Sequence, residues 1–175
     1  MKLIVAMCQK TRGIGYKNTL PFKMQNEMNR FKKLTIGNGN NAVIMGRKTW
    51  LSLPKKPLPN RSNIIISSNL NTSGTIIYKD PMSILKDKNK FENMWVIGGS
   101  NLYRFYLEAN LIDEIYLTEV IDVDKKIQYD TFFPTLSNKY NLVDNCGLIH
   151  YESECAGPEL IRYKYQYKRY KRNNM

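Results

Sequence analysis

The stretch "MWVIGGSNLYRFYLEA", residues 94–109, decides the fold class of this sequence. It opens with an apolar run as long as a buried strand, passes through Gly98 and Gly99, and continues as a helix-forming segment. The stretch "AVIMGRKTW", residues 42–50, has the same order around the single glycine Gly46. A buried strand followed at once by a helix is typical of α/β proteins with a largely parallel sheet.

The rest of the chain alternates between strand-like and helix-like segments in the same way. Further strands are predicted at residues 2–8, 63–68, 75–79 and 113–120, and further helices at about residues 24–35, 48–53 and from residue 80 onward. The chain ends in two strands suited to an antiparallel hairpin. The irregular segment "QKTRGIGYKNTLPFK", residues 9–23, is as long as the loops that act as lids or binding loops in compact domains.

Length and composition favour one domain, or two tightly fused halves, since the chain has 175 residues of which 42% are hydrophobic. The formal net charge is +12, which suits either small anionic ligands or polyanions, or reflects compositional bias. Basic residues concentrate in "IRYKYQYKRYKRNNM", residues 161–175, where tyrosines alternate with charged residues. That alternation predicts a strand with one apolar face, and we prefer it to the alternative of tyrosines that stack on nucleic-acid bases.

Several classes of protein and site are not expected. No apolar run approaches the roughly 20 residues of a membrane-spanning helix, and the N-terminal apolar segment is better explained as a strand than as a signal peptide. Three cysteines, Cys8, Cys146 and Cys155, are odd in number and widely spaced, which favours free thiols in a reducing, cytoplasmic compartment. The single histidine, His150, offers no multi-histidine metal site, and we expect no metal.

A carboxylate interrupts an apolar stripe in "LPFKMQNEMNRFKKLT", residues 20–35. Glu27 lies on the same helical face as Met24, Met28 and Phe31. One interpretation is structural: an acid in the first turn interacts with the helix dipole and can satisfy free N–H groups. The other is functional: a half-buried carboxylate in an apolar cleft has a raised pKa and is stabilised by a ligand with amidine-like donors.

Three predicted strands end in groups suited to phosphate. Gly46 and the pair Gly98 and Gly99 each precede a helix and leave backbone N–H groups free. Arg47 and Lys48 add charge after the first of these glycines, and Ser67 and Ser68 add hydroxyl donors at the end of a third strand. Together they indicate a dinucleotide with an additional phosphate, which favours NADPH over NADH. The G-x-G-x-x-G fingerprint of the Rossmann fold is absent.

These features converge on one family. The segments "LIVAM", "GIGYKNTLPF", "NEMNRFKKLT", "VIMGRKTW", "PLPNRSNIIISS", "VIGGSNLY", "IYLTEV" and "DTFFP" follow one another as in dihydrofolate reductases, and the sequence resembles that family over nearly its whole length. A glutamate at position 27 resembles the eukaryotic members. The resemblance implies a single domain over residues 1–175. It also implies a central eight-stranded, mostly parallel sheet with an antiparallel C-terminal strand, flanked by helices in three layers.

The resemblance also implies the reaction: NADPH delivers a hydride to C6 of 7,8-dihydrofolate while N5 gains a proton, giving tetrahydrofolate for one-carbon metabolism. The expected partners are dihydrofolate and NADPH, and the expected state is a monomer. Glu27 is the expected catalytic residue, binding the pterin amino and ring N–H groups. The substrate-binding residues that the resemblance implies are Val5, Ala6, Glu27, Met28, Phe31, Lys32, Leu53, Leu58, Arg61, Ile97, Tyr103 and Thr118. Those implied for the cofactor are Ala6, Met7, Ile14, Asn18, Leu20, Gly46, Arg47, Lys48, Thr49, Ser67, Ser68, Lys79, Gly98, Gly99, Ser100, Asn101, Leu102 and Tyr103.

One position departs from the family pattern, because Phe22 stands where the family usually has tryptophan, so an indole N–H near the expected proton path is missing. Asp130 is expected to brace the loop at residues 9–23. Two alternatives of other kinds remain: a pyrimidine reductase of riboflavin synthesis with the same fold, against which Glu27, Phe31 and Arg61 argue, and a basic nucleic-acid-binding protein.

Overall fold

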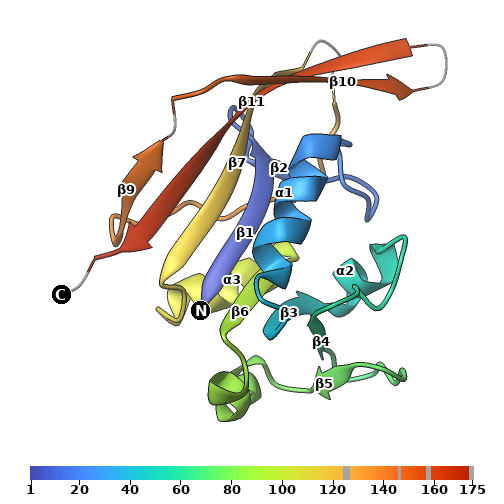
Figure 1. Cartoon of the computed structure of the whole chain (residues 1–175), viewed down its shortest axis with the longest axis vertical. Coiled ribbons are helices and arrows are strands. Elements are labelled where there is room, and N and C mark those ends of the chain that lie inside the picture. The colour runs from blue at the N-terminus through green and yellow to red at the C-terminus, as the bar shows by residue number, and fades with distance from the viewer. Residues whose placement is uncertain (124–126, 146, 157–158, 174–175) are drawn as a thin grey trace.

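A mixed β-sheet with helices on both faces forms the centre of the computed structural model, which describes residues 1–123, 127–145, 147–156 and 159–173 (Figure 1). The strands of the main sheet are β1 (Lys2–Cys8), β3 (Asn41–Gly46), β4 (Ser62–Ile66), β5 (Ile76–Tyr78), β6 (Asn93–Gly98), β7 (Glu114–Val123), β9 (Tyr140–Asn145), β10 (His150–Ala156) and β11 (Glu159–Arg172). Eight of them follow the order β10-β11-β7-β1-β6-β3-β4-β5, and β9 pairs with another part of β11. The predicted α/β class is confirmed.

The sheet is parallel from β7 to β5 and antiparallel at its C-terminal end. The neighbours β7–β1, β1–β6, β6–β3, β3–β4 and β4–β5 are all parallel, whereas β11 is antiparallel to β7, β9 and β10. A second, two-stranded sheet joins β2 (Gly13–Gly15) to β8 (Thr131–Phe132). The predicted irregular segment at residues 9–23 therefore contains a short strand.

Alternate residues of the central strands separate two apolar layers. Leu3, Val5 and Ile44 pack on the side of α3 (Ser100–Glu108), which contributes Tyr103 and Tyr106. On the other side, Ile4, Val43, Met45 and Trp95 pack with residues of α1 (Gln25–Ile36) and α2 (Arg47–Ser52), including Phe31 and Trp50. This alternation follows from the two-residue period of a strand, and it gives the three-layer arrangement visible in Figure 1.

Local sequence explains where the helices begin and end. Gly37 ends α1 with φ of 53°, a left-handed conformation that glycine adopts without strain. A 3₁₀ helix, η1 (Pro81–Lys90), begins after Asp80, whose side chain accepts a hydrogen bond from the Ser83 N–H at 3.0 Å. The predicted helix start at residue 80 is thus confirmed, although the helix is of the tighter 3₁₀ type.

The basic C-terminal stretch is a strand within the sheet. Tyr163 and Tyr165 are buried with Met24 and Val120, and residues 168–172 pair with β7 and β9. Buried tyrosine rings are not available to stack on nucleic-acid bases. The alternation of tyrosine with charged residues is therefore explained by the two faces of β11.

Among the described residues, no helix is long and apolar enough to cross a membrane. In the same part of the chain, no three His, Cys, Asp or Glu residues are grouped so that they could hold a metal ion. Cys8 carries a free thiol. Cys146 lies outside the described residues, as does the Cys155 side chain.

Candidate active site

Glu27 is buried in the first turn of α1, with only 7% of its surface exposed. Its Oε2 accepts a hydrogen bond from the Thr118 hydroxyl at 2.7 Å, and the Arg30 guanidinium lies 3.9 Å from the same oxygen. Thr118 lies on β7 opposite Ala6 of β1, so two neighbouring parallel strands form the floor beneath the carboxylate. The sequence-based expectation that an acid lies on the core side of this helix is confirmed.

Burial raises the pKa of Glu27 from 4.5 to about 7. Desolvation is the largest cause, because a charged carboxylate loses its hydration in this niche. The Thr118 hydrogen bond and the positive charge of Arg30 lower the pKa, and the negative charge of Glu152 raises it. A carboxyl group that titrates near neutral pH in a partly apolar niche can be either an acceptor for ligand N–H groups or a proton carrier.

The structural interpretation of Glu27 is only half correct. Glu27 lies in the first turn, where it interacts with the helix dipole, but a different residue satisfies the free N–H groups of that turn. The backbone N–H groups of Gln25 and Asn26 donate to the carboxylate of Glu152, on β10. Glu27 is therefore free of a capping role.

Apolar side chains from α1, β6 and the segment after α2 lie on the face of the sheet that α1 covers. Phe31, Leu53, Leu58 and Ile97 are partly buried against the layer that contains Trp50. Val5 is buried and Ala6 half-buried on β1, while Met28 is 43% exposed and Lys32 is exposed on α1. Because Met28 is exposed and Glu27 before it is buried, an accessible apolar side chain lies next to the Glu27 carboxylate and the Thr118 hydroxyl.

Arg61 lies beside Phe31 and the C-terminal part of α1. Its Nη1 donates to the Thr35 hydroxyl at 2.6 Å, its Nε donates to the Pro59 carbonyl at 3.1 Å, and its guanidinium lies 5.7 Å from the Phe31 ring centre. Burial lowers the pKa of Arg61. These contacts orient the guanidinium and leave N–H groups for a carboxylate ligand.

The glycines predicted at the strand ends meet in space. Met45 pairs with Gly98 across β3 and β6, and a Cβ added to Gly46 would lie 4.0 Å from the Gly98 carbonyl. Gly98 and Gly99 are joined by a cis peptide bond, and Gly98 has φ of 125°. A Cβ at Gly98 would lie 3.4 Å from the Tyr103 hydroxyl and 3.5 Å from the Thr49 hydroxyl. Two helices, α2 and α3, begin beside this glycine surface with no side-chain cap.

The other predicted cofactor residues surround these strand ends. Ser67 and Ser68 follow β4, with Ser67 half-buried and Ser68 exposed. Arg47, Lys48 and Lys79 are exposed, and Tyr103 is buried with its hydroxyl donating to the Ile4 carbonyl at 2.9 Å. Ser100 donates from its hydroxyl to the Phe132 carbonyl at 2.6 Å, which connects α3 to β8.

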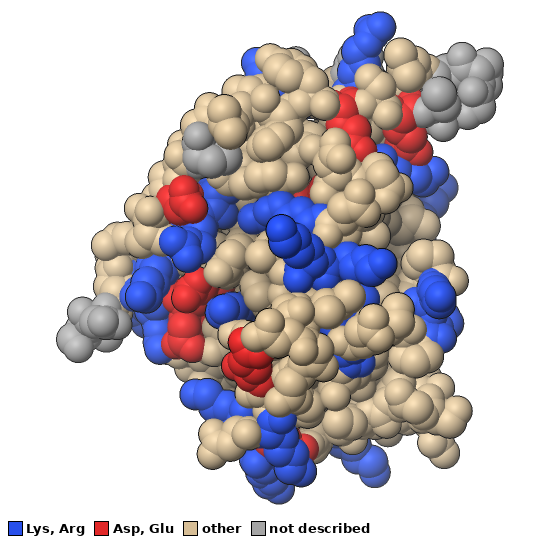
Figure 2. Space-filling view, in the orientation of Figure 1, with Lys and Arg blue, Asp and Glu red and all other residues tan. Residues whose placement is uncertain are grey.

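Figure 2 shows Lys and Arg side chains gathered over the middle of the face that α1 covers.

The segment at residues 9–23 is held by β8, as predicted for Asp130. The Lys17 N–H donates to the Asp130 carboxylate at 2.7 Å, and the Asp130 N–H donates to the Gly15 carbonyl at 3.0 Å. Ile14 is buried in this segment, Met7 on β1 is half-buried, and Asn18 and Leu20 are exposed. Phe22 is buried, with its ring 6.1 Å from that of Tyr129 and 6.2 Å from that of Tyr163.

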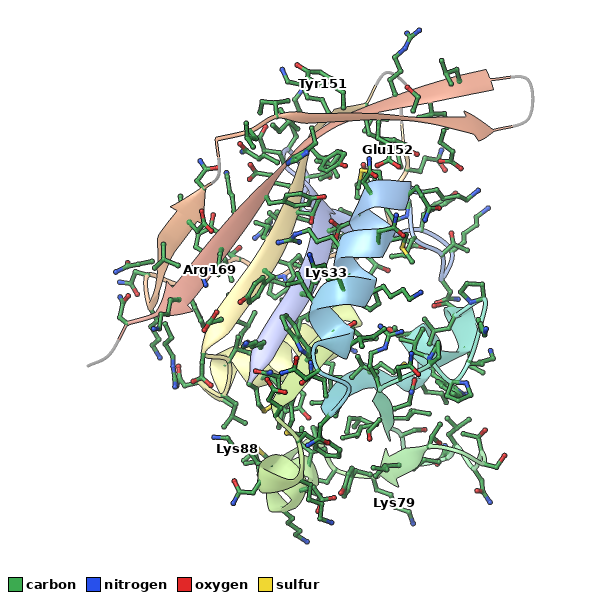
Figure 3. All side chains as sticks on the ribbon, viewed as in Figure 1. Lys33, Lys79, Lys88, Tyr151, Glu152 and Arg169 are labelled. Atoms are coloured by element: carbon green, nitrogen blue, oxygen red, sulfur yellow. The ribbon has the colours of Figure 1, made fainter. Side chains whose placement is uncertain are left out.

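Sequence reasoning missed Glu152. Its only sequence signal is the alternation of acids at positions 152 and 154 on a predicted strand. That pattern does not show that this strand, more than 120 residues after Gln25 in the sequence, contacts the start of α1. Figure 3 shows Glu152 beside the end of α1 that lies nearest β10.

Comparisons with known proteins give consistent matches to one family. A family model described as Dihydrofolate reductase matches residues 1–172. The curated relatives include proteins named dihydrofolate reductase from Drosophila melanogaster, with 34% identity over 81% of this chain and 82% of the relative, and from Sus scrofa, with 31% identity over 99% and 98%. Another, from Buchnera aphidicola, is 42% identical over 75% of this chain and 77% of its own length. The chain therefore belongs to the dihydrofolate reductase family of oxidoreductases.

Proposed function

We propose that this protein reduces 7,8-dihydrofolate to 5,6,7,8-tetrahydrofolate with NADPH as the hydride donor. Family membership supports the reaction, and the observation that carries the proposal is the buried Glu27 on its Thr118 floor. A pterin ring presents a 2-amino group and a ring N–H side by side, and these two donors match the two oxygens of one carboxylate. Glu27 binds this edge of the ring.

The proposed substrate site extends from Glu27 along α1. Val5, Ala6, Ile97, Tyr103 and Thr118 line the pterin end, where β1, β6, β7 and α3 come together. Met28, Phe31, Leu53 and Leu58 hold the aminobenzoyl ring between α1 and the segment after α2. Arg61 binds the α-carboxylate of the glutamate tail, with Lys32 nearby, and its hydrogen bonds to Thr35 and Pro59 orient it for that task.

A dinucleotide fits the residues at the strand ends. The glycine surface at Gly46, Gly98 and Gly99 is one that added Cβ atoms would fill, so the backbone can approach a pyrophosphate closely. Arg47, Lys48 and Ser68 are the proposed partners of the 2′-phosphate that distinguishes NADPH from NADH. The remaining proposed cofactor contacts are Ala6, Met7, Ile14, Asn18, Leu20, Thr49, Ser67, Lys79, Ser100, Asn101, Leu102 and Tyr103.

NADPH, when bound, supplies the hydride that C6 of the substrate receives. The residues of this chain position, shield and polarise the reacting ring. Glu27 holds the far edge of the pterin, away from N5, so it orients the ring while a water admitted by movement of residues 9–23 protonates N5. Asp130 holds that segment through the Lys17 N–H.

We also propose that residues 1–175 form one reductase domain that acts as a monomer in the cytoplasm. The match of the family model over residues 1–172 supports the single domain.

The test is an absorbance assay of NADPH oxidation with dihydrofolate. The wild type turns over, and Glu27→Gln and Glu27→Ala lower kcat/KM by roughly 100-fold or more above neutral pH. The loss is smaller at low pH, because wild-type Glu27 is then itself protonated and neutral. Glu108→Gln, at an exposed carboxylate of α3, is the control and keeps wild-type activity.

Full activity in Glu27→Ala would refute the role given to Glu27. A wild type that oxidises no NADPH with dihydrofolate would refute the reaction. Thermal shifts with a folate analogue and with a pyrimidine substrate of riboflavin synthesis separate the proposed enzyme from a reductase of the same fold, since only the proposed enzyme is stabilised by the folate analogue.

A further inference from the structure

The start of α1 has no cap of its own. Met24 at the N-cap position is apolar and makes no side-chain hydrogen bond, so the first N–H groups of the helix need partners from elsewhere. Glu152 supplies them: the Asn26 N–H lies 3.1 Å and 3.2 Å from its two carboxylate oxygens, and the Gln25 N–H also donates to it. A carboxylate at this position also interacts favourably with the helix dipole.

The carboxylate of Glu152 is itself fixed from the sheet. The Tyr165 hydroxyl donates to its Oε2 at 3.2 Å, and Glu152 pairs with Tyr163 in the β10–β11 ladder. Tyr165 is fully buried, and the His150 ring stacks on it at 5.3 Å between centres. The buried Tyr165 hydroxyl therefore holds the Glu152 carboxylate that caps the start of α1.

Glu152 of β10 and Glu27 of α1 both lie at the N-terminal end of α1. The charged and titratable groups around Glu27 are Arg30 on its own helix, Glu152 on β10 and Tyr167 on β11, while β7 contributes the uncharged Thr118. Arg30 is drawn toward β11, since its guanidinium lies 4.0 Å from the Tyr167 ring centre. Glu152 is thus the acidic neighbour that opposes a negative charge on Glu27.

We propose that Glu152 is a positioning residue of the substrate site: it anchors the first turn of α1 to the C-terminal hairpin and so fixes where Glu27 lies. The inference rests on the proposed role of Glu27. Through Glu152, a strand far from α1 in the sequence controls both where Glu27 lies and the pH at which it can accept two hydrogen bonds from a pterin.

The hairpin offers a matched control in Glu154, two residues further along β10. Glu154 also accepts a hydrogen bond from a tyrosine of β11, Tyr163, at 3.0 Å, but its basic contact is Lys23, which precedes α1, at 3.4 Å. Glu154 accepts no described hydrogen bond from the helix backbone. Glu154→Gln thus removes an acid from the same strand without changing the cap at the start of α1.

The experiment follows the Glu27 carboxyl carbon by NMR in protein labelled at glutamate, with its resonance assigned by comparison with Glu27→Gln. Glu152→Gln keeps an oxygen that can accept from the helix and loses the charge, so the Glu27 titration midpoint falls by roughly half a pH unit. Glu152→Ala loses the cap as well, and its Tm is lower by roughly 2–4 °C. In Glu154→Gln the midpoint is that of the wild type.

The pH profile of dihydrofolate turnover gives a second readout, in which the loss of rate on the acid side moves to lower pH in Glu152→Gln, together with the Glu27 midpoint. The inference is overturned if Glu152→Gln leaves the Glu27 midpoint unchanged, or if Glu154→Gln moves it equally. The NMR titration needs no substrate, so it separates the two proposals. A protein that fails to reduce dihydrofolate but shows the shift contradicts the reaction and retains the coupling between the two acids.

Discussion

Burial of Glu27 carries a stability cost that depends on pH. Because its pKa in the folded protein is raised from 4.5 to about 7, Glu27 favours folding only while it is protonated. Its contribution is fully present below its ordinary pKa and is lost as the pH rises through about 7. A ligand that donates hydrogen bonds to the ionised carboxylate would compensate for this loss.

Glu27→Gln is therefore expected to stabilise the protein above neutral pH. The neutral amide can still accept the Thr118 hydrogen bond, and it removes a buried charge that costs on the order of 3 kcal/mol. The gain vanishes below the ordinary pKa of a glutamate. Chemical denaturation as a function of pH measures it, with Glu108→Gln as the control, and equal stability of the variant and wild type at high pH would contradict the prediction.

At the scale of elements, the glycines at the ends of β3 and β6 form the surface proposed to bind the cofactor. Gly98 has φ of 125°, so a side chain there is strained, and its Cβ would contact the Tyr103 and Thr49 hydroxyls. Gly74 also has positive φ, of 71°, but an added Cβ would have nothing within 4 Å. Both glycines therefore test the cost of a strained backbone, but only Gly98 lies at the proposed cofactor surface.

Gly98→Ala is expected to cost roughly 2–3 kcal/mol of stability and to weaken NADPH binding by at least about tenfold, because the strand end has to shift. Gly74→Ala costs roughly 1–2 kcal/mol and leaves NADPH affinity unchanged. Calorimetric titration with NADPH and thermal unfolding measure the two effects. Wild-type NADPH affinity in Gly98→Ala would show that the glycine surface does not face the cofactor.

Elements with strong local patterns could be predicted from the sequence, and those formed by distant pairing could not. The strand at residues 2–8 and the helix after Met24 carry clear apolar periodicity, and the structure places them as Lys2–Cys8 and Gln25–Ile36. Strands β2, β8 and β9 span only three, two and six residues, and β9 is mostly exposed, so no periodic apolar face marks them. Their existence depends on partners elsewhere in the chain.

The candidate site divides in the same way. Glu27, Gly46 and the Gly98–Gly99 pair could be found because each breaks or ends a local pattern, a charge in an apolar stripe or a glycine at the end of a strand. Glu152 could not, because its importance comes from the packing of β10 over the start of α1. Local periodicity contains no information on that contact.

At the scale of the whole molecule, a buried ion pair ties β11 to β7. Lys168 Nζ lies 2.5 Å from Glu119 Oε2, Gln166 donates to the same oxygen at 2.6 Å, and both charged side chains are largely buried. Gln9, at the start of the segment at residues 9–23, donates to it at 3.3 Å. Removal of one charge leaves the other buried without its counterion.

Lys168→Met is expected to destabilise the protein by about 3 kcal/mol, and the double variant Lys168→Met with Glu119→Gln recovers much of that loss. The pair between Lys23 and Glu154 is the control, because Lys23 itself is exposed and Lys23→Met changes stability by roughly 0.5 kcal/mol or less. Denaturant titrations of the four proteins measure these differences. A loss in Lys168→Met no larger than in Lys23→Met would refute a structural role for the buried pair.

The place of β11 in the sheet has a consequence for synthesis on the ribosome. β11 lies between β10 and β7, yet it is the last of the described strands to be translated. Until it emerges, the nascent chain exposes the edge of β7, and Glu152 lacks the Tyr165 hydroxyl that holds it at the start of α1. The surroundings of Glu27 are thus completed late, and an unpaired β7 edge is the surface on which a chaperone would act or aggregation would begin.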